Sequence, residues 1–419
     1  SDLLGTEQMS GVAIVNQLIF VYNLAIFGAV SAASIFGAQY FGKGNHKGHM
    51  YSFRFKLYAT LLVTGGAILL FLTKGSALIS LYLTDTVGNG ATDLALQYGL
   101  EYLAIMMVGL IPFAVNQSYA TNIKETGQTF IPMLASFVAV GTNAILDYLM
   151  IFGIGPFPEL GVQGAALATV IARYIEALIV VIWAHIHRGK NRYLEGAYTG
   201  FGIPLAELKA ILIKGFPLMM NEVLWAAGMT TVTQCYSVRG LDVVAGLNIA
   251  STITNLFNIV YLQLGSCISI VVGQYLGAGK LEDAKDADNK MIVFSVFCCV
   301  IMAALMFVVG GFFPGIYNTT EEIRELATSF IAVSAIIMPF CAFSHASYFT
   351  LRSGGKTVVT FLFDSVFTWV IVVPAAYLLA HFTGLGIVSI YFLVQGTELI
   401  KVIIGYLMVK SNVWVVQMV

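Results

Sequence analysis

The sequence predicts an all-α polytopic membrane protein whose helices form two related lobes. Three observations support this fold class: a composition suited to lipid, a series of apolar segments long enough to cross a bilayer, and an internal repeat. Of the 419 residues, 58% are hydrophobic and only 10% are charged, and the mean hydropathy is +0.85. A soluble domain carries about 25% charged residues, so lipid must replace the missing polar surface in this chain.

The charge balance and the cysteines exclude several other classes of protein. The formal net charge is −1, so the chain offers no strongly basic surface for nucleic acid. The sequence has no G-x-x-x-x-G-K-[ST] phosphate loop, no H-E-x-x-H and no G-x-S-x-G, and we expect no bound cofactor. The five cysteines lie inside apolar runs at no metal-ligand spacing, which favours a packing role over disulfides: Cys235, Cys267, Cys298, Cys299 and Cys341.

The apolar segments predict eleven membrane-spanning helices. A hydrocarbon core of about 30 Å requires roughly 20 apolar helical residues. Segments of that kind lie near residues 10–41, 51–82, 94–122, 129–153, 163–186, 207–237, 243–276, 290–316, 322–351, 357–381 and 386–409. Several of them exceed one crossing, so tilted helices or protruding ends are expected.

Lys and Arg residues are distributed unequally between the two ends of these segments. Three of the 21 fall on one side and two lie within helices. The other sixteen lie together on the opposite side: Lys43, Lys47, Arg54, Lys56, Lys124, Arg188, Lys190, Arg192, Lys209, Lys214, Lys280, Lys285, Lys290, Arg352, Lys356 and Lys410. By the positive-inside rule that side is cytoplasmic, and the C-terminus lies on it.

The chain contains an internal repeat with an offset of 235 residues. Residues 5–44 align with 240–279 without a gap, and eleven of the forty aligned positions are identical. The clearest match pairs QYFGKG in the first copy with QYLGAG in the second. Pro112 and Pro339 also occupy similar places in the two copies. Two copies of an apolar helical repeat are typical of secondary transporters.

The repeat predicts two lobes of six helices, with only five helices in the first lobe of this chain. Residues 1–186 would form the amino-terminal lobe, 187–206 a cytoplasmic connection, and 207–419 the carboxyl-terminal lobe. The helix at 207–237 precedes the second copy, and its counterpart would precede residue 5. We therefore expect the chain to lack most of the first helix of a twelve-helix pattern whose two halves are parallel in topology.

Several stretches, in their order, spacing and duplication, resemble bacterial multidrug and toxic compound extrusion (MATE) transporters over essentially the whole chain. These stretches are GAQYFGKGN (37–45), NAILDYLMIFG (143–153), GVQGAALAT (161–169), VVAGLNI (243–249), GQYLGAGKLEDA (273–284) and YFTLRSGGKT (348–357). The resemblance implies two lobes around a central cavity and a location in the cytoplasmic membrane of a bacterium. It also implies export of amphipathic, mostly cationic compounds in exchange for inward H⁺ or Na⁺.

Glu222 is the most informative ionisable residue within the predicted spans. A charge near the bilayer centre is costly, so it needs a partner or a function. Glu222 lies about 12 Å along the helix axis from Lys214, at 1.5 Å per residue. We interpret it as a cavity carboxylate that alternates between a proton or cation and the drug; the alternative is a neutral acid bonded to a neighbouring helix. The resemblance places the family's carboxylate one turn later, near Trp225, so both residues are expected at the substrate cavity.

Asn143, Asp147 and Thr169 form a second candidate site. Asn143 and Asp147 are four residues apart and share one helix face, and Thr169 would add a hydroxyl from the next helix. Carboxylate, amide and hydroxyl oxygens suit Na⁺ or a hydrated proton relay. The resemblance assigns these positions to an amino-lobe cation site, together with a first-helix aspartate that is expected to lie before residue 1. The alternative is that Asp147 bonds nearby backbone.

For the other ionisable residues in the predicted spans, a structural role can explain the charge as well as a functional one. Asp364 lies eight residues into its helix and is predicted as a coupling carboxylate, with a structural role as the alternative. Arg173 and Glu176 are opposite charges three residues apart, and so are Glu398 and Lys401. Such spacing favours a mutual ion pair in each case.

Four further positions are predicted to shape the cavity or to bend the helices. Asn116 and Gln117 are expected to line the substrate cavity. Pro112 and Pro339 each remove a backbone hydrogen bond and permit a bend. We expect both prolines to act as hinges, although simple helix irregularity explains them equally well.

These observations lead to a secondary active transporter, not an enzyme, that functions as a monomer in the bilayer and uses an ion gradient. One alternative is a lipid-linked oligosaccharide or polysaccharide flippase of the same superfamily, which would have a more cationic cavity. Another is a membrane-embedded lipid-modifying enzyme, which would need a clustered catalytic set. The ionisable residues inside the spans are mostly acidic, and this favours cation-coupled export of drugs.

Overall fold

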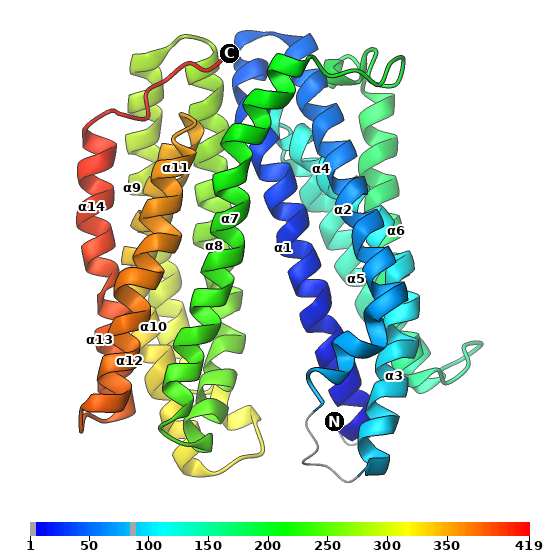
Figure 1. The fold of residues 1–419 in the computed structure, drawn as a ribbon, viewed down its shortest axis with the longest axis vertical. Helices are drawn as coiled ribbons and strands as arrows, with labels where there is room; N and C mark the ends of the chain where they lie inside the picture. The colour runs from blue at the N-terminus through cyan, green and yellow to red at the C-terminus, as the bar shows by residue number, and fades with distance from the viewer. Residues whose placement is uncertain (1–5, 84–88) are drawn as a thin grey trace. The chain divides into compact units, whose positions relative to one another are not determined.

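The computed structural model describes residues 6–83 and 89–419, and every regular element in those ranges is helical (Figure 1). The predicted all-α fold is therefore confirmed. The elements are α1 (Thr6–Lys43), α2 (His46–Ser80), α3 (Asn89–Val108), α4 (Leu110–Glu125), α5 (Phe130–Phe152), α6 (Gly161–Ile186), η1 (Arg192–Leu194), α7 (Leu205–Ser237), α8 (Leu241–Gly277), α9 (Leu281–Gly310), η2 (Phe313–Ile316), α10 (Glu321–Ser353), α11 (Thr357–Phe361), η3 (Leu362–Val366), η4 (Thr368–Val372), α12 (Val373–Phe382), α13 (Ile387–Gly396) and α14 (Glu398–Lys410).

The described part of the chain contains ten helices that are long and apolar enough to cross a membrane. Two of these spans are interrupted: α11 to α12, with the π-helical turns η3 and η4 between them, cover Thr357–Phe382, and α13 with α14 covers Ile387–Lys410. Taken together, α3 and α4 are also long and apolar enough to cross a membrane, and they bend by 42° at their junction. Counted as one span, this pair makes eleven, the predicted number.

The chain divides into two compact units, and unit 1 holds the described residues up to Gly37 and within His46–Ala210. Within it α5 packs along α6, and α4 contacts both α2 and α6. Its core gathers aliphatic side chains such as Ile26, Leu103 and Leu110, each at most 1% exposed. Because lipid is as apolar as these side chains, close packing rather than exclusion of water holds such a bundle together.

The connection predicted at residues 187–206 packs onto α2 of the same unit. Its backbone carbonyls accept three hydrogen bonds from the guanidinium of Arg54. The distances are 2.6 Å to Gly196, 2.9 Å to Ala197 and 2.7 Å to Gly202. The planar fork of an arginine suits several carbonyls at once, so Arg54 fixes this connection to unit 1.

Unit 2 consists of Ala38–Asn45 and Ile211–Val419, and α10 is its central helix. This helix packs against α8, α9, α13 and α14. Phe330 and Met338 from α10 and Cys299 from α9 are at most 1% exposed in the core. All five cysteines are free, and two of them, Cys235 and Cys299, are buried.

The two copies of the repeated QYxGxG motif meet inside unit 2. A Cβ atom on Gly42 would overlap the backbone carbonyl of Gln274, and one on Gly277 would overlap the carbonyl of Gln39. The contact is therefore reciprocal between equivalent positions of the repeat. Gln39 strengthens it by donating from Nε2 to the carbonyl of Ser353 at 2.9 Å. Only glycine permits such a close approach of two backbones.

Replacing either of these glycines with alanine is expected to destabilise the protein. The added methyl group of Gly42→Ala or Gly277→Ala must push two backbones apart, which costs about 1–3 kcal/mol in well-packed sites. Thermal unfolding in detergent should show a lower midpoint for both variants. Gly65→Ala is the matched control, since no described atom lies within 4 Å of its added Cβ. A midpoint for Gly277→Ala equal to that of the control would contradict the close contact.

Candidate functional site

The candidate site of unit 2 is built around an ion pair between Asp364 and Lys401. The Nζ atom of Lys401 lies 2.6 Å from Oδ1 of Asp364, and the two side chains are only 8% and 15% exposed. Asn221 donates from Nδ2 to the other carboxylate oxygen at 3.0 Å. The predicted ion pair between Lys401 and Glu398 is therefore wrong, because Lys401 pairs with a carboxylate on another helix.

A widened helical turn, η3, places Asp364 in this position. The side chain of Asn221 from α7 inserts beside the backbone of η3 and accepts from Ser365, from the amide N–H at 3.2 Å and from the hydroxyl at 2.7 Å. A side chain that enters the backbone hydrogen-bond ladder distorts a helix, and π-helical turns occur frequently at functional sites. Asn221 thus binds both Asp364 and the turn that carries it.

Glu222 follows Asn221 on α7 and is half-buried. The charges of Arg352 and Asp364 both act on its carboxylate. Asn221 also donates to the hydroxyl of Tyr348 on α10 at 3.4 Å, which ties α7 to the central helix at this level. Trp225, expected beside Glu222 at the substrate cavity, is half-buried one turn further along α7.

The ionisable groups of this cluster leave one negative charge uncompensated. Among the described residues it holds three carboxylates, Glu222, Asp364 and Glu398, and two cations, Arg352 and Lys401. Lys401 interacts with both Asp364 and Glu398. The Oε1 atom of Glu398 is buried without a hydrogen-bond partner in the part of the chain that the structure describes. The cluster therefore has room for one further positive charge.

In unit 1 the structure brings two of the three predicted ligands together. Asn143 on α5 donates from Nδ2 to the hydroxyl of Thr169 on α6 at 3.3 Å. Asp147, one turn along α5, is half-buried, and its Oδ1 atom is buried with no hydrogen-bond partner among the described residues. Because Asn143 and Asp147 are four residues apart on α5, the orphaned carboxylate oxygen shares a helix face with the contact between Asn143 and Thr169. Carboxylate, amide and hydroxyl oxygens are ligands that a small hard cation accepts.

The predicted ion pair between Arg173 and Glu176 is wrong. In the described ranges their charged atoms do not come within the 4 Å of an ion pair, and each group has another partner. Arg173 donates to the carbonyl of Gly109 at 3.4 Å and lies 5.0 Å from the ring centroid of Phe113. Glu176 accepts from the hydroxyl of Ser136 at 2.6 Å. Partners on other helices replace the neighbour on the same helix in both cases.

The two prolines predicted as hinges lie in different surroundings. Pro112 follows the 42° bend between α3 and α4, whose junction is Gly109. Pro339 lies inside α10, which runs without interruption from Glu321 to Ser353. A hinge function stays a prediction at both positions.

The predicted cavity residues Asn116 and Gln117 lie on α4. Asn116 is only 3% exposed, and its Oδ1 atom lacks a hydrogen-bond partner within the described ranges. Gln117 is half-buried, and its backbone carbonyl accepts from Thr121 at 2.7 Å. Their place at a substrate cavity stays a prediction.

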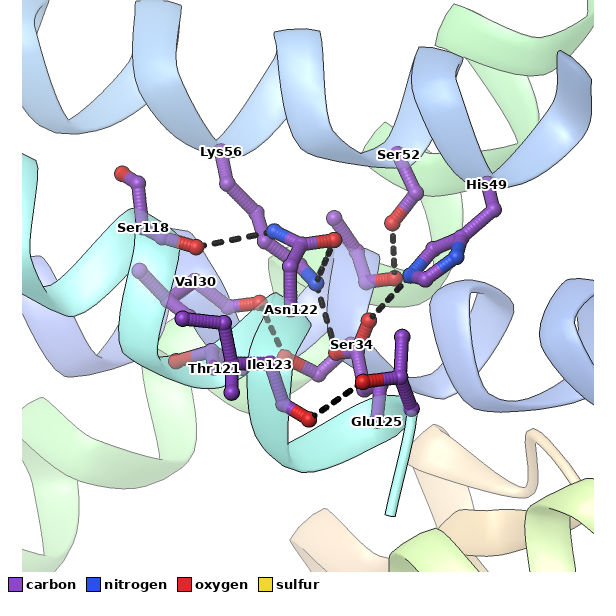
Figure 2. A network of polar contacts seen from close by, with 12 residues as sticks. Val30, Ser34, His49, Ser52, Lys56, Ser118, Thr121, Asn122, Ile123 and Glu125 are labelled. Atoms are coloured by element: carbon purple, nitrogen blue, oxygen red, sulfur yellow. Dashed lines mark hydrogen bonds and ion pairs between the residues drawn. The ribbon is translucent and has the colours of Figure 1, made fainter. Parts of the chain in front are cut away.

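A second buried ionic group, in unit 1, was missed by the sequence analysis. Figure 2 shows Lys56 and His49 projecting from α2 toward Glu125, the last residue of α4. Lys56 Nζ lies 2.5 Å from Oε1 of Glu125, and His49 Nε2 lies 3.2 Å from its Oε2. Lys56 and Glu125 are fully buried and His49 is 1% exposed. We call these three residues the Glu125 cluster.

Buried polar side chains continue from the Glu125 cluster along α2 and α4. Lys56 also donates to Asn122 at 3.3 Å, and the hydroxyls of Thr60 and Ser118 are 2.9 Å apart. One turn further, Thr64 is hydrogen-bonded to the hydroxyl of Tyr22 at 2.9 Å. Lys56, Thr60 and Thr64 recur every four residues in an apolar helix, and this polar stripe is the sequence signal that could have revealed the network.

Two curated relatives are similar to this chain over most of its length. A probable multidrug resistance protein NorM from Thermotoga maritima is 23% identical over 91% of this chain and 80% of its own length. A probable multidrug resistance protein YoeA from Bacillus subtilis is 21% identical over 93% of this chain and 82% of its own length.

Two solved structures share the fold. An outward-facing multidrug resistance MATE family transporter of the MOP superfamily gives a TM-score of 0.84 at 20% identity, over 98% of this chain and 88% of that one. A MOP superfamily transporter from Pyrococcus furiosus, described as having a binding pocket of reverse polarity, gives 0.86 at 19% identity, over 97% and 88%. The predicted two-lobe helical fold is confirmed by these likenesses.

The family itself is shown by a match to a whole-family sequence model. The model described as MatE matches residues 1–149 and 217–378, which together are most of the chain. This confirms the resemblance noted in the sequence and the expectation of a transporter rather than an enzyme. The chain is a multi-pass membrane protein that belongs to the MatE family of transporters.

Proposed function

We propose that this chain exports amphipathic, mostly cationic drugs in antiport with H⁺ or Na⁺ by alternating access. The relatives named as multidrug resistance proteins support the substrate class. The observation that carries the proposal is the uncompensated negative charge of unit 2, where three carboxylates share two cations. A buried negative charge within a membrane span requires a positive partner, and a proton, a Na⁺ ion or the drug itself can serve.

Exchange follows if the ion and the drug compete for that charge. Glu222 is half-buried and has no fixed ion pair within 4 Å among the described residues, so it is the group that we assign to the competition. Trp225, one turn away, offers an aromatic face to an organic cation. Coupling then requires that the ion and the drug prefer different arrangements of the lobes, because a ligand with equal affinity for both shifts nothing.

We propose that unit 1 binds the coupling ion at Asn143, Asp147 and Thr169. The orphaned Oδ1 atom of Asp147 and the contact between Asn143 and Thr169 support this assignment. Here a Na⁺ ion would be transported cargo held by three protein oxygens, and a proton would reside on the carboxylate. Sodium accepts such hard oxygen ligands, so the donor set is compatible with either ion.

Asp147→Asn is expected to weaken the binding of the coupling ion. One charged contact contributes about 1.5–3 kcal/mol, so the ion concentration for half-maximal transport should rise by at least about tenfold. Transport assays at graded pH or Na⁺ would measure this shift. Asp242→Asn at an exposed position of α8 is the matched control. An unchanged half-maximal concentration in Asp147→Asn would remove unit 1 from the coupling step.

The orientation and surroundings of the chain are also proposed. The sixteen clustered Lys and Arg residues support a cytoplasmic C-terminus, and the bacterial relatives support the cytoplasmic membrane of a bacterium. Both candidate sites are built from one chain, so we propose that a monomer is sufficient for transport.

The direct test uses the purified protein in liposomes under imposed gradients. Vesicles with an acidic or a sodium-rich lumen should accumulate ethidium, a fluorescent organic cation, against its concentration gradient. The gradient that drives accumulation identifies the coupling ion. Equal accumulation with the pH gradient, the Na⁺ gradient and the membrane potential all collapsed would overturn the proposal.

A further inference from the structure

We infer that Lys401 is an internal counter-ion, paired with Asp364 and attracted by Glu398, that limits unit 2 to one external cation per transport cycle. This inference rests on the proposed antiport, and it names the residue that sets how many ions are exchanged in each cycle. The geometry supports this inference, because the Nζ atom of Lys401 lies 2.6 Å from Oδ1 of Asp364, where an external cation would otherwise bind.

Lys401 is held in place by its surroundings as well as by its ion pair. Its Nζ atom lies 5.4 Å from the ring centroid of Phe363 and 6.0 Å from that of Phe367, both on the span that carries Asp364. Aromatic faces attract an ammonium group, and a desolvated site strengthens the attraction. An external cation can therefore reach Asp364 only by displacing Lys401 from a favourable position.

Glu398 provides the place to which a displaced Lys401 can move. It precedes Lys401 by three residues on α14, so both side chains share one helix face. Its Oε1 atom is buried and lacks a hydrogen-bond partner among the residues described. Glu398 also begins α14, where the helix dipole stabilises a carboxylate. Lys401 thus has two carboxylates within its surroundings and can form an ion pair with one of them at a time.

The charge of the whole cluster determines how many ions it takes up. Ionisable groups from several helices interact in this cluster. Among the described residues they are Glu222 from α7, Tyr261 from α8, Cys299 from α9, Cys341, His345, Tyr348 and Arg352 from α10, Asp364 from η3, Tyr391 from α13, and Glu398 and Lys401 from α14. With neutral histidine, cysteine and tyrosine, the three carboxylates and two cations leave a net charge of −1. One proton or one Na⁺ neutralises it.

Changes of Lys401 and Asp364 should alter the ion count in a fixed pattern. Lys401→Met leaves a charge of −2, so one additional ion should enter per drug molecule. Asp364→Asn leaves a neutral cluster, so one ion fewer should be exchanged. The double variant Asp364→Asn with Lys401→Met again carries −1, and its ion count should return to that of the wild type.

The experiment measures how many ions the full chain exchanges for each ethidium molecule in liposomes. A fixed ion gradient is imposed, and the ethidium gradient at which net ethidium flux stops gives this ratio. Lys290→Met is the matched control, because Lys290 forms an exposed pair with Asp286 at 2.6 Å. We expect ratios that differ from the wild type by +1 for Lys401→Met, −1 for Asp364→Asn, and zero for the double variant and the control.

A second measurement covers variants that fold but transport slowly. Ion release on ethidium binding, followed in detergent with a pH indicator or a sodium-selective electrode, should show the same differences of +1, −1 and zero. If Lys401→Met does not fold, the Asp364→Asn and double variants still decide the matter. A Lys401→Met ratio equal to the wild type, or a double variant that resembles Asp364→Asn, would overturn the inference. Absence of ion-coupled transport in the wild type would instead overturn the proposed antiport.

Discussion

Replacing Glu222 with glutamine is expected to reduce gradient-driven export to background while the protein stays folded. Glutamine has nearly the same shape, but it can neither bind a proton nor attract a cation. Because Glu222 is the group for which the ion and the drug compete, neither ligand retains a preference for one conformation there once its carboxylate is removed. Ethidium accumulation under the gradient that drives the wild type measures the effect.

Two further variants separate this loss from general damage. Glu282→Gln makes the same chemical change at a surface carboxylate that is 85% exposed, and it should transport like the wild type. Glu222→Asp keeps the charge on a shorter side chain, so it should retain coupling at a reduced rate. Export at the wild-type level by Glu222→Gln would exclude Glu222 from the mechanism.

The fold was predictable because it depends on composition and periodicity, which are local properties of the sequence. Long apolar runs must be helical in lipid, since every backbone polar group must find a partner within the segment. The offset of 235 residues also identified a motif whose copies prove to touch, through Gly42 and Gly277. The π-helical turn at Asp364 was not predictable, because Asn221, 143 residues away in sequence, creates it.

The candidate sites were predicted only in part, for a related reason. Spacing on one helix suggested a partner for Lys401 three residues away, yet its ion pair is with Asp364, 37 residues away on a different helix. Arg173 follows the same pattern. Buried charges select partners by three-dimensional proximity, and the i,i+3 rule describes exposed helix surfaces. The orphaned oxygen of Asp147 was likewise invisible until α5 and α6 were placed.

The Glu125 cluster was missed because the positive-inside rule treats every lysine near a loop as a surface charge. Lys56 was counted with the loop residues, but α2 begins at His46, so Lys56 lies almost three turns inside the helix. Nothing in the sequence near Lys56 indicates that Glu125, 69 residues later, will neutralise it. A charge at that depth must have a partner, and this requirement was the missed signal.

Breaking the ion pair of the Glu125 cluster is expected to produce the largest loss of stability of any single substitution considered. Lys56→Met leaves the fully buried Glu125 with His49 beside it but without its nearest cation. Removing one partner of a buried pair typically costs about 3–5 kcal/mol, because an uncompensated charge remains. Unfolding of the purified protein by a denaturing detergent, followed by tryptophan fluorescence, should show a transition at a much lower denaturant fraction.

The double variant Lys56→Met with Glu125→Leu tests whether the loss comes from the stranded charge. Removing both charges should recover much of the stability, since buried pairs replaced by apolar groups of similar volume are often neutral. Lys290→Met breaks an exposed pair, with side chains 74% and 65% exposed, and should change stability by about 1 kcal/mol or less. If the loss of unfolding free energy in the double variant equals the sum of the losses in the two single variants, the two residues do not interact energetically. The short distance between Lys56 and Glu125 would then reflect packing alone, and the polar stripe along α2 would need another explanation.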